Sequence, residues 1–221
     1  MKPFAGIGVE ILAVVVLGCC AWIGLTADAV ETNQMASVKP VPEGAEVIVL
    51  GAGCFWCTEA VFQQIPGVLS VTPGYMGGHV KNPTYEMVCT GDTGHAEVAR
   101  VVYNPKQIAL EKILDVFWEI HDPTSLNRQW NDVGTQYRSA IFYANDEQRR
   151  IAEAYIAQLD KARVFPRPLV TKVVPLQAFY PAEAYHQNYA ALHPSQPYIM
   201  YNDAPKVEHL RQEFPDLYTG K

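Results

Sequence analysis

The sequence predicts an α+β fold in which a mixed β-sheet packs against a layer of helices. Short apolar runs and amphipathic segments alternate along the chain, and their order mixes hairpin connections with helical ones. Of the 221 residues, 49% are hydrophobic and 18% are charged, which excludes a disordered, collagen-like or coiled-coil chain. The net charge of −6 provides no basic surplus for phosphate groups, so we expect no nucleic-acid partner.

The folded region is expected to begin with a buried strand that leads into a helix. Residues 47–50 form an apolar run that ends at Gly51-Ala52-Gly53, as in a strand followed by a tight turn. Residues 54–65 carry apolar side chains at helical spacing, and Pro66-Gly67 then stops the helix.

The remaining elements continue this alternation. Further strands are predicted over residues 68–75, 96–103, 136–143 and 168–178. Further helices are predicted over residues 108–121, 146–161 and 182–192, with Asn145 as the N-cap of the second. This order favours a two-layer α/β sandwich with a mixed sheet and a ferredoxin-like core over a doubly wound parallel sheet.

The N-terminal segment has the pattern of an export signal or membrane anchor. Residues 4–25 are apolar with one charge, Glu10, and a membrane-spanning helix needs about 20 such residues. Lys2 precedes the segment and Ala27-Asp28-Ala29 follows it as a small-residue cleavage site. A cleaved signal peptide, a retained anchor and a lipoprotein signal ending at Cys19 all remain open. Each of them predicts a periplasmic or extracellular protein that meets the membrane only through this segment.

The chain therefore divides into three parts. Residues 1–29 are expected to be the signal peptide or membrane anchor. Residues 30–45 read as a linker because they are small and polar and contain Pro40, Pro42 and Gly44. Residues 46–221 are expected to form one catalytic domain.

Two of the five cysteines are placed for redox chemistry. Cys54 directly follows the glycine turn at the start of the predicted helix, where free N–H groups and the helix dipole lower a thiol pKa. Cys57 lies one turn further along, and residues at i and i+3 are neighbours on a helix. We interpret Cys54 and Cys57 as a redox pair. We expect no metal site, because a zinc site needs four ligands and no second close Cys/His pair is present.

Several loops rich in Gly, Asn, Asp and Tyr follow, and together they resemble a known family. The matching segments are GCFW at 53–56, GYMGG at 74–78, NPTY at 82–85, TGDTGHAE at 90–97, HDP at 121–123 and NDVGTQYRSAIFY at 131–143. In this order they resemble the A-type peptide methionine sulfoxide reductases. YHQNY at 185–189 and PKV at 205–207 extend the resemblance over about residues 46–210. The mixed-sheet α+β fold of that family agrees with the predicted elements.

The resemblance implies a role for each matching residue. Cys54 would be the nucleophile, and Glu97 would hydrogen-bond the sulfoxide oxygen and supply a proton. Phe55 and Trp56 would form the apolar wall around the S-methyl group. Tyr85 and Tyr137 would donate hydrogen bonds to the oxygen, and Asp132 would line the same pocket. A sulfoxide needs such a donor, and burial beside aromatic rings raises a carboxyl pKa toward the neutral form. Thiolate attack would then release methionine and leave Cys54 as a sulfenic acid.

The sequence departs from the family pattern at three places. Cys57 stands where many members have glycine, no cysteine follows Cys89, and Trp130 replaces a commoner glycine. We therefore hypothesise that Cys57 resolves the sulfenic acid and that thioredoxin or another dithiol reduces the resulting disulfide, with no bound cofactor. Cys89 is the rival partner, although a buried structural thiol in a short helical turn is the preferred interpretation.

The expected substrates are oxidised proteins and free methionine sulfoxide, as the S epimer, which implies protein repair under oxidative stress. An exported thioredoxin-like disulfide oxidoreductase that uses Cys54 and Cys57 is the alternative enzyme class. A membrane-tethered binding module without catalysis is the non-enzymatic alternative. Glu97 discriminates between the two enzymes, because general disulfide exchange has no need of it.

Overall fold

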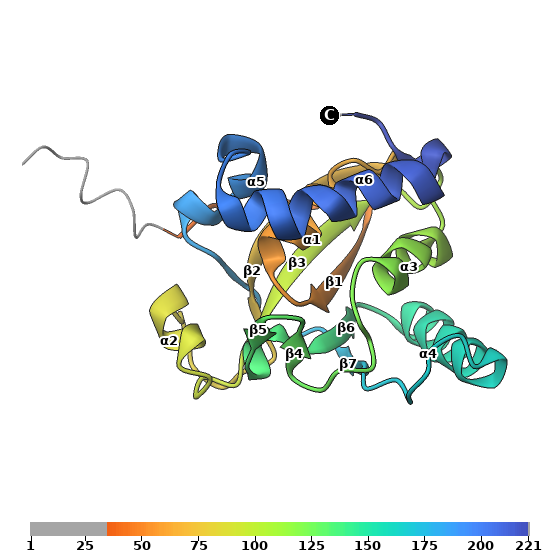
Figure 1. Cartoon of the computed structure of the whole chain (residues 1–221), viewed down its shortest axis with the longest axis horizontal. Helices are drawn as coiled ribbons and strands as arrows, with labels where there is room; N and C mark the ends of the chain where they lie inside the picture. The colour runs from red at the N-terminus through yellow and green to blue at the C-terminus, as the bar shows by residue number, and fades with distance from the viewer. Residues whose placement is uncertain (1–34, 221) are drawn as a thin grey trace, which may run out of the picture.

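A six-stranded sheet forms the centre of the computed structural model, which describes residues 35–220 (Figure 1). Its strands lie in the order β7-β6-β1-β3-β2-β8, and β4 and β5 form a separate hairpin. The bounds are β1 Glu46–Ala52, β2 Val68–Met76, β3 Ala96–Tyr103, β4 Arg128–Gln129, β5 Asp132–Val133, β6 Ser139–Tyr143, β7 Lys172–Pro175 and β8 Tyr180–Pro181. Only β6 and β7 pair in parallel within the described sheet, so the predicted α+β fold with a mixed sheet is confirmed.

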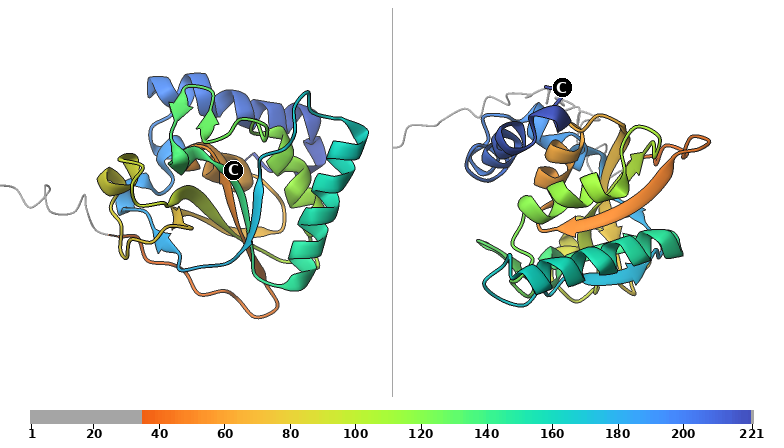
Figure 2. Two further views of the ribbon diagram at one scale, coloured as in Figure 1. Left: turned by 90° about the horizontal axis from the view of Figure 1, so that it is seen from below. Right: turned by 90° about the vertical axis from the view of Figure 1, so that its right-hand side faces the viewer.

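The longer helices pack on one face of this sheet. They are α1 Phe55–Phe62, α3 Leu110–Glu119, α4 Asp146–Ala162 and α6 Ala204–Glu213. The shorter helices are α2 Tyr85–Cys89 and α5 Tyr189–Leu192, with a π-helical segment over Ile199–Asp203 just before α6. In Figure 1, α6 lies across α1, and in Figure 2, α4 runs beside β6 and β7 at one edge of the sheet.

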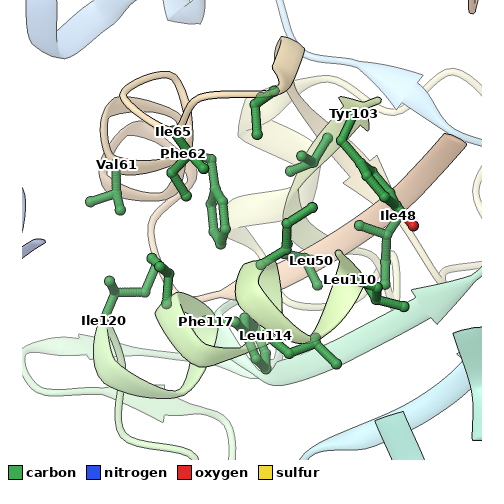
Figure 3. Packing of buried hydrophobic residues seen from close by; sticks show 14 of the residues in the cluster. Ile48, Leu50, Val61, Phe62, Ile65, Tyr103, Leu110, Leu114, Phe117 and Ile120 are labelled. Carbon is green, nitrogen blue, oxygen red and sulfur yellow. The ribbon is translucent and has the colours of Figure 1, made fainter. Parts of the chain in front are cut away.

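The apolar core forms where side chains alternate along the strands. Ile48 and Leu50 point to the helical face, whereas Val49 belongs to a cluster on the opposite face. Figure 3 shows the helical side of this core, in which α1, α3, β1 and β3 direct apolar side chains toward one another. The labelled residues are Ile48, Leu50, Val61, Phe62, Ile65, Tyr103, Leu110, Leu114, Phe117 and Ile120. This packing fixes the end of β1 against the start of α1, where the redox cysteines lie.

Most predicted elements are present at close to their predicted bounds. The strand predicted over residues 96–103 is β3 without change, and the helix over 146–161 is α4, one residue longer. Asn145 is the N-cap of α4, as predicted, and its side chain accepts a hydrogen bond from the Gln148 N–H. The strand predicted over residues 136–143 is shorter, because Thr135–Tyr137 forms a 3₁₀ turn before β6.

The C-terminal third departs most from the prediction. The helix predicted over residues 182–192 is wrong: β8 is followed by a 3₁₀ turn, and α5 begins only at Tyr189. Asn188 interrupts it with a left-handed backbone, which an asparagine adopts more readily than most residues. The strand predicted over residues 168–178 shrinks to β7, and α6 was not predicted at all.

The expected signal or anchor over residues 1–29 and the first residues of the linker lie outside the described residues. None of the helices within residues 35–220 is both long enough and apolar enough to span a bilayer.

Candidate active site

The site is built around the turn that joins β1 to α1. Gly53 has φ +90°, and a Cβ atom there would lie 2.6 Å from the Gln129 side chain, so glycine is required on both counts. Gln129 is itself held by hydrogen bonds to the backbone of Asp122. Cys54 follows as the N-cap of α1, one residue before the helical position we predicted for it. The turn thus presents the Cys54 thiol at the helix N-terminus.

The environment of Cys54 overturns the expected lowering of its pKa. Burial raises the pKa of this thiol well above the usual value, and the nearby Glu97 and Asp203 carboxyl groups raise it further. A hydrogen bond with the Tyr198 hydroxyl acts in the opposite direction. The helix N-terminus therefore does not dominate, because removal from water and nearby acidic groups disfavour the thiolate more strongly.

Glu97 is delivered to the site by the register of the sheet. Glu97 of β3 pairs with Tyr75 of β2, and both side chains face the start of α1. The Glu97 side chain is 2% exposed, and its Oε2 accepts a hydrogen bond of 3.1 Å from the Phe55 N–H. Burial raises the pKa of Glu97 to about 8, although the Phe55 N–H opposes this. At neutral pH Glu97 is therefore mostly a neutral acid that can donate a proton.

Two predicted aromatic residues line the same end of α1. Phe55 is buried against the Tyr75 ring, with 5.8 Å between the ring centroids. Trp56 stacks on Tyr189 of α5 at 3.9 Å and an interplanar angle of 10°. The Trp56 indole N–H donates a hydrogen bond of 3.0 Å to Nδ1 of His186. Each ring is therefore held in place by contacts with distant segments of the chain.

His186 and Glu183 support this aromatic wall, and neither was assigned a role from the sequence. Burial lowers the pKa of His186 to about 4, so its ring is neutral at pH 7 and the proton is on Nε2, opposite the nitrogen that accepts from Trp56. The Glu183 carboxylate accepts hydrogen bonds from the Tyr75 hydroxyl at 2.9 Å and the Tyr85 N–H at 2.8 Å. His186 belongs to the YHQNY segment, and Glu183 lies two residues before it.

The two predicted tyrosines flank Glu97. The Tyr85 ring packs against His186 at 4.6 Å between centroids. Burial and the Glu97 carboxyl group raise the pKa of both Tyr85 and Tyr137 above the usual range. Both hydroxyls therefore keep their protons at any physiological pH and can donate hydrogen bonds, and that of Tyr85 is hydrogen-bonded to the Cys89 thiol in this structure.

Asp132 lies in the β4–β5 hairpin, at the point where this hairpin meets the C-terminal segment. Its Oδ2 accepts a hydrogen bond of 2.6 Å from the Tyr198 hydroxyl. Because the same hydroxyl also bonds Cys54, Tyr198 links the hairpin to the reactive thiol. Sequence reasoning did not find Tyr198, which lies more than 140 positions from Cys54 in the chain.

Cys57 faces the same C-terminal segment. Its side chain is 2% exposed, and the structure contains no disulfide between it and Cys54. Burial raises the pKa of the Cys57 thiol to about 11, although the Lys206 ammonium group, which hydrogen-bonds the thiol, opposes this. The buried Asp203 carboxyl group lies close enough to raise the pKa of both cysteines.

Cys89 does not fit the buried structural thiol that we expected. It is the last residue of α2, as the predicted short helical turn implied, but its side chain is exposed. The N-cap Thr84 and the contact of Val88 with the core hold α2 in place, so the cysteine itself is not needed for packing. Burial in the core therefore does not explain why a cysteine occupies this position.

Trp130 has an unusual backbone for a large residue. Its φ angle is +48°, in the left-handed region that favours glycine, which explains why glycine suits this position. The ring is 54% exposed, and the Lys206 ammonium group lies over it at 4.5 Å from its centroid. Trp130 therefore provides a cation–π contact for the lysine that bonds Cys57.

A cavity of about 900 Å³ lies behind α1, bordered by β2, α5 and α6. Asp203 lines it, whereas Cys54, Glu97 and the two predicted tyrosines do not. The chemistry is therefore at the N-terminus of α1 and not in this cavity. Over residues 35–220, no group of three or more His, Cys, Asp or Glu side chains could hold a metal ion.

The matching family model and the similar curated proteins carry the same description. The family model described as peptide methionine sulfoxide reductase matches residues 46–218. The peptide methionine sulfoxide reductase MsrA of Saccharolobus solfataricus is 53% identical over 171 residues, which cover 77% of this chain and 96% of the relative. The Thermus thermophilus protein of the same name is 51% identical over 172 residues, which cover 78% and 97%.

Two solved structures are similar in fold. Mxr1 from Saccharomyces cerevisiae in reduced form has a TM-score of 0.65 and 35% identity, with 72% of this chain and 92% of that chain covered. Methionine sulfoxide reductase A of Corynebacterium diphtheriae has a TM-score of 0.63 and 34% identity, with coverage of 75% and 90%.

Proposed function

Because the chain belongs to the peptide methionine sulfoxide reductase family, we propose that its site reduces methionine S-sulfoxide through Cys54 and is regenerated through Cys57. Membership makes the protein an oxidoreductase, a peptide-methionine (S)-S-oxide reductase. The observation that carries the mechanism is the convergence of Cys54, neutral Glu97 and a fixed aromatic wall at the start of α1.

The first step transfers the sulfoxide oxygen to the enzyme. Glu97 donates its proton to this oxygen, and the Tyr85 and Tyr137 hydroxyls hydrogen-bond it, as donors do in an oxyanion hole. The Cys54 sulfur attacks the sulfoxide sulfur, helped by the Tyr198 hydroxyl, which favours the thiolate. Methionine leaves, and Cys54, oxidised by two electrons, becomes a sulfenic acid. Phe55, Trp56 and Asp132 line the space that the substrate occupies.

The second step removes the sulfenic acid. The Cys57 sulfur attacks the Cys54 sulfur, a disulfide forms, and the oxygen leaves as water. A thioredoxin-like protein or another dithiol then reduces the disulfide. Support for Cys57 as the resolving thiol comes from its position one turn along α1 and from the absence of any cysteine after Cys89 in the sequence.

The substrates would be oxidised proteins and free methionine sulfoxide, so the enzyme would serve protein repair under oxidative stress. The test is turnover of separated S and R epimers of a methionine sulfoxide peptide, with dithiothreitol as reductant. We expect activity on the S epimer for the wild type, none for Cys54→Ser and strongly reduced turnover for Cys57→Ser. Cys89→Ser is the matched control, because Cys89 is exposed and lies on another element. Activity on the R epimer alone would contradict the assignment.

A general disulfide oxidoreductase of the thioredoxin type is not favoured. It would use the Cys54–Cys57 pair, but it leaves the buried, proton-bearing Glu97 without a purpose. The comparisons also match methionine sulfoxide reductases over most of the chain.

The N-terminal segment adds a proposal about location. An apolar stretch over residues 4–25 would export the domain to the periplasm or the extracellular space and, if retained, would anchor it to the membrane. N-terminal sequencing of protein recovered from each cell fraction tests this. Recovery of the uncleaved protein from the cytoplasm would contradict it.

A further inference from the structure

Asp203 is a buried acid whose position the proposed mechanism does not yet explain. Its side chain is 1% exposed, and within the described residues neither of its carboxyl oxygens has a hydrogen-bond partner. Burying a carboxyl group without a partner is costly, so such groups are rare outside functional sites. Asp203 ends the π-helical segment before α6, and such segments often occur at functional sites.

The surroundings of Asp203 connect it to the redox pair. The segment Ile199–Asp203 packs directly against α1, which carries both cysteines. Asp203 raises the pKa of Cys54 and of Cys57 through its charge, without a direct hydrogen bond to either sulfur, and it lines one cavity with Ala60, which is one turn along α1 from Cys57. Asp203 therefore stands beside the place where the disulfide would form.

Lys206, one turn along from Asp203, completes the group. Its ammonium group hydrogen-bonds the Cys57 thiol and also acts on Asp203. The Trp130 ring holds it from the other side at 4.5 Å. A cation in this position stabilises the Cys57 thiolate, which burial otherwise disfavours.

We propose that Asp203 is the proton-transfer group of the second step and that Lys206 holds Cys57 and its thiolate in place for attack on the Cys54 sulfenic acid. This inference rests on the proposed function and deepens it, because that function left Cys57 without a base. Neither residue is required for the first step, in which Glu97 supplies the proton.

The step balances without any further reactant. The Asp203 carboxylate takes the proton from the Cys57 thiol through one water of the cavity that Asp203 lines, and the thiolate attacks the Cys54 sulfur. The sulfur–oxygen bond of the sulfenic acid breaks as the disulfide forms, and the leaving oxygen takes the proton from Asp203 to depart as water. Cys57 supplies the electron pair for the new bond, and Asp203 returns to its starting state.

The test compares the two steps in one experiment. Enzyme is mixed with one equivalent of a methionine S-sulfoxide peptide without reductant and quenched at intervals. Released methionine reports the first step, and loss of alkylatable Cys57, measured by mass spectrometry, reports the second. For Asp203→Asn we expect the second-step rate to fall about 100-fold, as for other losses of a proton-transfer group, whereas the first-step rate should not fall, because Asp203 only raises the pKa of Cys54. Glu208→Gln is the matched control, because Glu208 is on α6 and borders the same cavity.

A pH profile separates proton transfer from a merely structural effect. The titratable groups around Asp203 and the Cys57 thiol are Cys54, Glu97, Asp132, Tyr198 and Lys206. Three further titratable groups, Lys39, Glu59 and Glu208, line the adjoining cavity. Burial raises the pKa of Asp203 to about 7, so the second step in the wild type should accelerate as pH rises through 7 and Asp203 ionises. In Asp203→Asn this rise should move toward the higher pKa of the Cys57 thiol, about 11.

The outcomes decide between the claims. An unchanged second-step rate in Asp203→Asn, or a wild-type second step that does not accelerate near pH 7, overturns the inference. The wild-type profile keeps the test valid if Asp203→Asn fails to fold and releases no methionine. If wild-type enzyme releases methionine but Cys57 stays free, it is the proposed resolving role of Cys57 that fails, and the inference falls with it.

Discussion

At the scale of single residues, the proposed chemistry depends on the proton that the buried Glu97 carboxyl group keeps near neutral pH. Glu97 is buried and Cys54 is half-buried, and the environment of both favours their protonated forms. The acid therefore keeps its proton near neutral pH, ready for a sulfoxide oxygen. Tyr198 provides the one contact that favours the thiolate before substrate arrives. The protonation state of the Cys54 nucleophile therefore depends more on these neighbouring groups than on the helix dipole.

Replacing Glu97 with glutamine should slow the first step strongly. A glutamine keeps the shape and accepts the Phe55 N–H hydrogen bond, but it has no proton to give, so methionine release should fall about 100-fold or more. Single-turnover release of methionine without reductant measures this. Glu153→Gln on the exposed side of α4 is the control. If Glu97→Gln released methionine at the wild-type rate, Glu97 would not be the acid.

The first step should also have a characteristic pH dependence. The pKa of Glu97 is raised to about 8, so the fraction that carries the proton falls as pH rises through 8. In the wild type, the rate of methionine release should therefore stop rising with pH near 8, because loss of the Glu97 proton offsets the growing thiolate fraction of Cys54. The same single-turnover measurement at pH 6 to 10 checks this, and in Glu97→Gln the rate, although lower, should keep rising through this range. A wild-type rate that keeps rising through this range would count against a protonated Glu97.

The residues that contiguous motifs singled out are ones that the structure brings together. Cys54, Glu97, Tyr85 and Tyr137 lie within segments that could be read directly, and the structure brings them together at the start of α1. Lys206 and Asp203 could not be found in this way. Their closeness to Cys57 depends on how the C-terminal segment folds back over α1, and no local pattern encodes that contact.

At the scale of elements, capping and turn geometry fix the frame that carries the site. Asn145 begins α4, and Gly53 allows the turn into α1. These features were readable because caps and turns use local chemistry. α6 was missed because it has only a few apolar contacts, through Val207 and Leu210, and so lacks a strong helical periodicity. The false helix over residues 182–192 followed from an apolar pattern that Asn188 interrupts.

The N-cap of α4 provides a test at this scale. The Asn145 side chain accepts from the Gln148 N–H at 2.9 Å, so Asn145→Ala leaves that N–H without its partner. We expect the free energy of unfolding to fall by about 1 kcal/mol. Urea denaturation of reduced protein measures this, with Asn145→Ser as a control that retains a capping oxygen. Equal stabilities for the alanine and serine variants would show that the cap contributes nothing.

At the scale of the whole molecule, the α+β class was predictable because strands and helices alternate along the sequence in short, well-bounded runs. The strand order was not, because pairing of β1 between β3 and β6 depends on contacts between distant segments. Burying a carboxyl group costs free energy, and this fold buries three of them with raised pKa values, those of Glu59, Glu97 and Asp203.

These buried acids should make the fold less stable as pH rises. Their pKa values in the folded state are about 7, 8 and 7, above the values of an unfolded chain, so the folded state binds more protons between about pH 4 and 8. The stabilisation is complete at low pH and is lost through pH 7 to 8. The buried His121 and His186 have lowered pKa values and act in the opposite direction, but only below about pH 6.5.

The free energy of unfolding should therefore decrease by about 3 to 4 kcal/mol between pH 6.5 and 8.5. Urea denaturation at several pH values, with the thiols kept reduced, measures this. In Asp203→Asn the decrease should be smaller, because one of the three titrating groups is gone. A stability that stays constant or increases over this range would show that these carboxyl groups are not protonated in the folded protein.

The central claim, reduction at Cys54 with resolution by Cys57, is tested most directly by the state of the cysteines after one turnover. Wild-type enzyme is given one equivalent of a methionine S-sulfoxide peptide without reductant, quenched in acid, digested and mapped by mass spectrometry. The account predicts one methionine released per enzyme and a peptide pair joined by a Cys54–Cys57 disulfide, with Cys89 still free. A persistent sulfenic acid on Cys54 with Cys57 free, or a disulfide to Cys89, would contradict it.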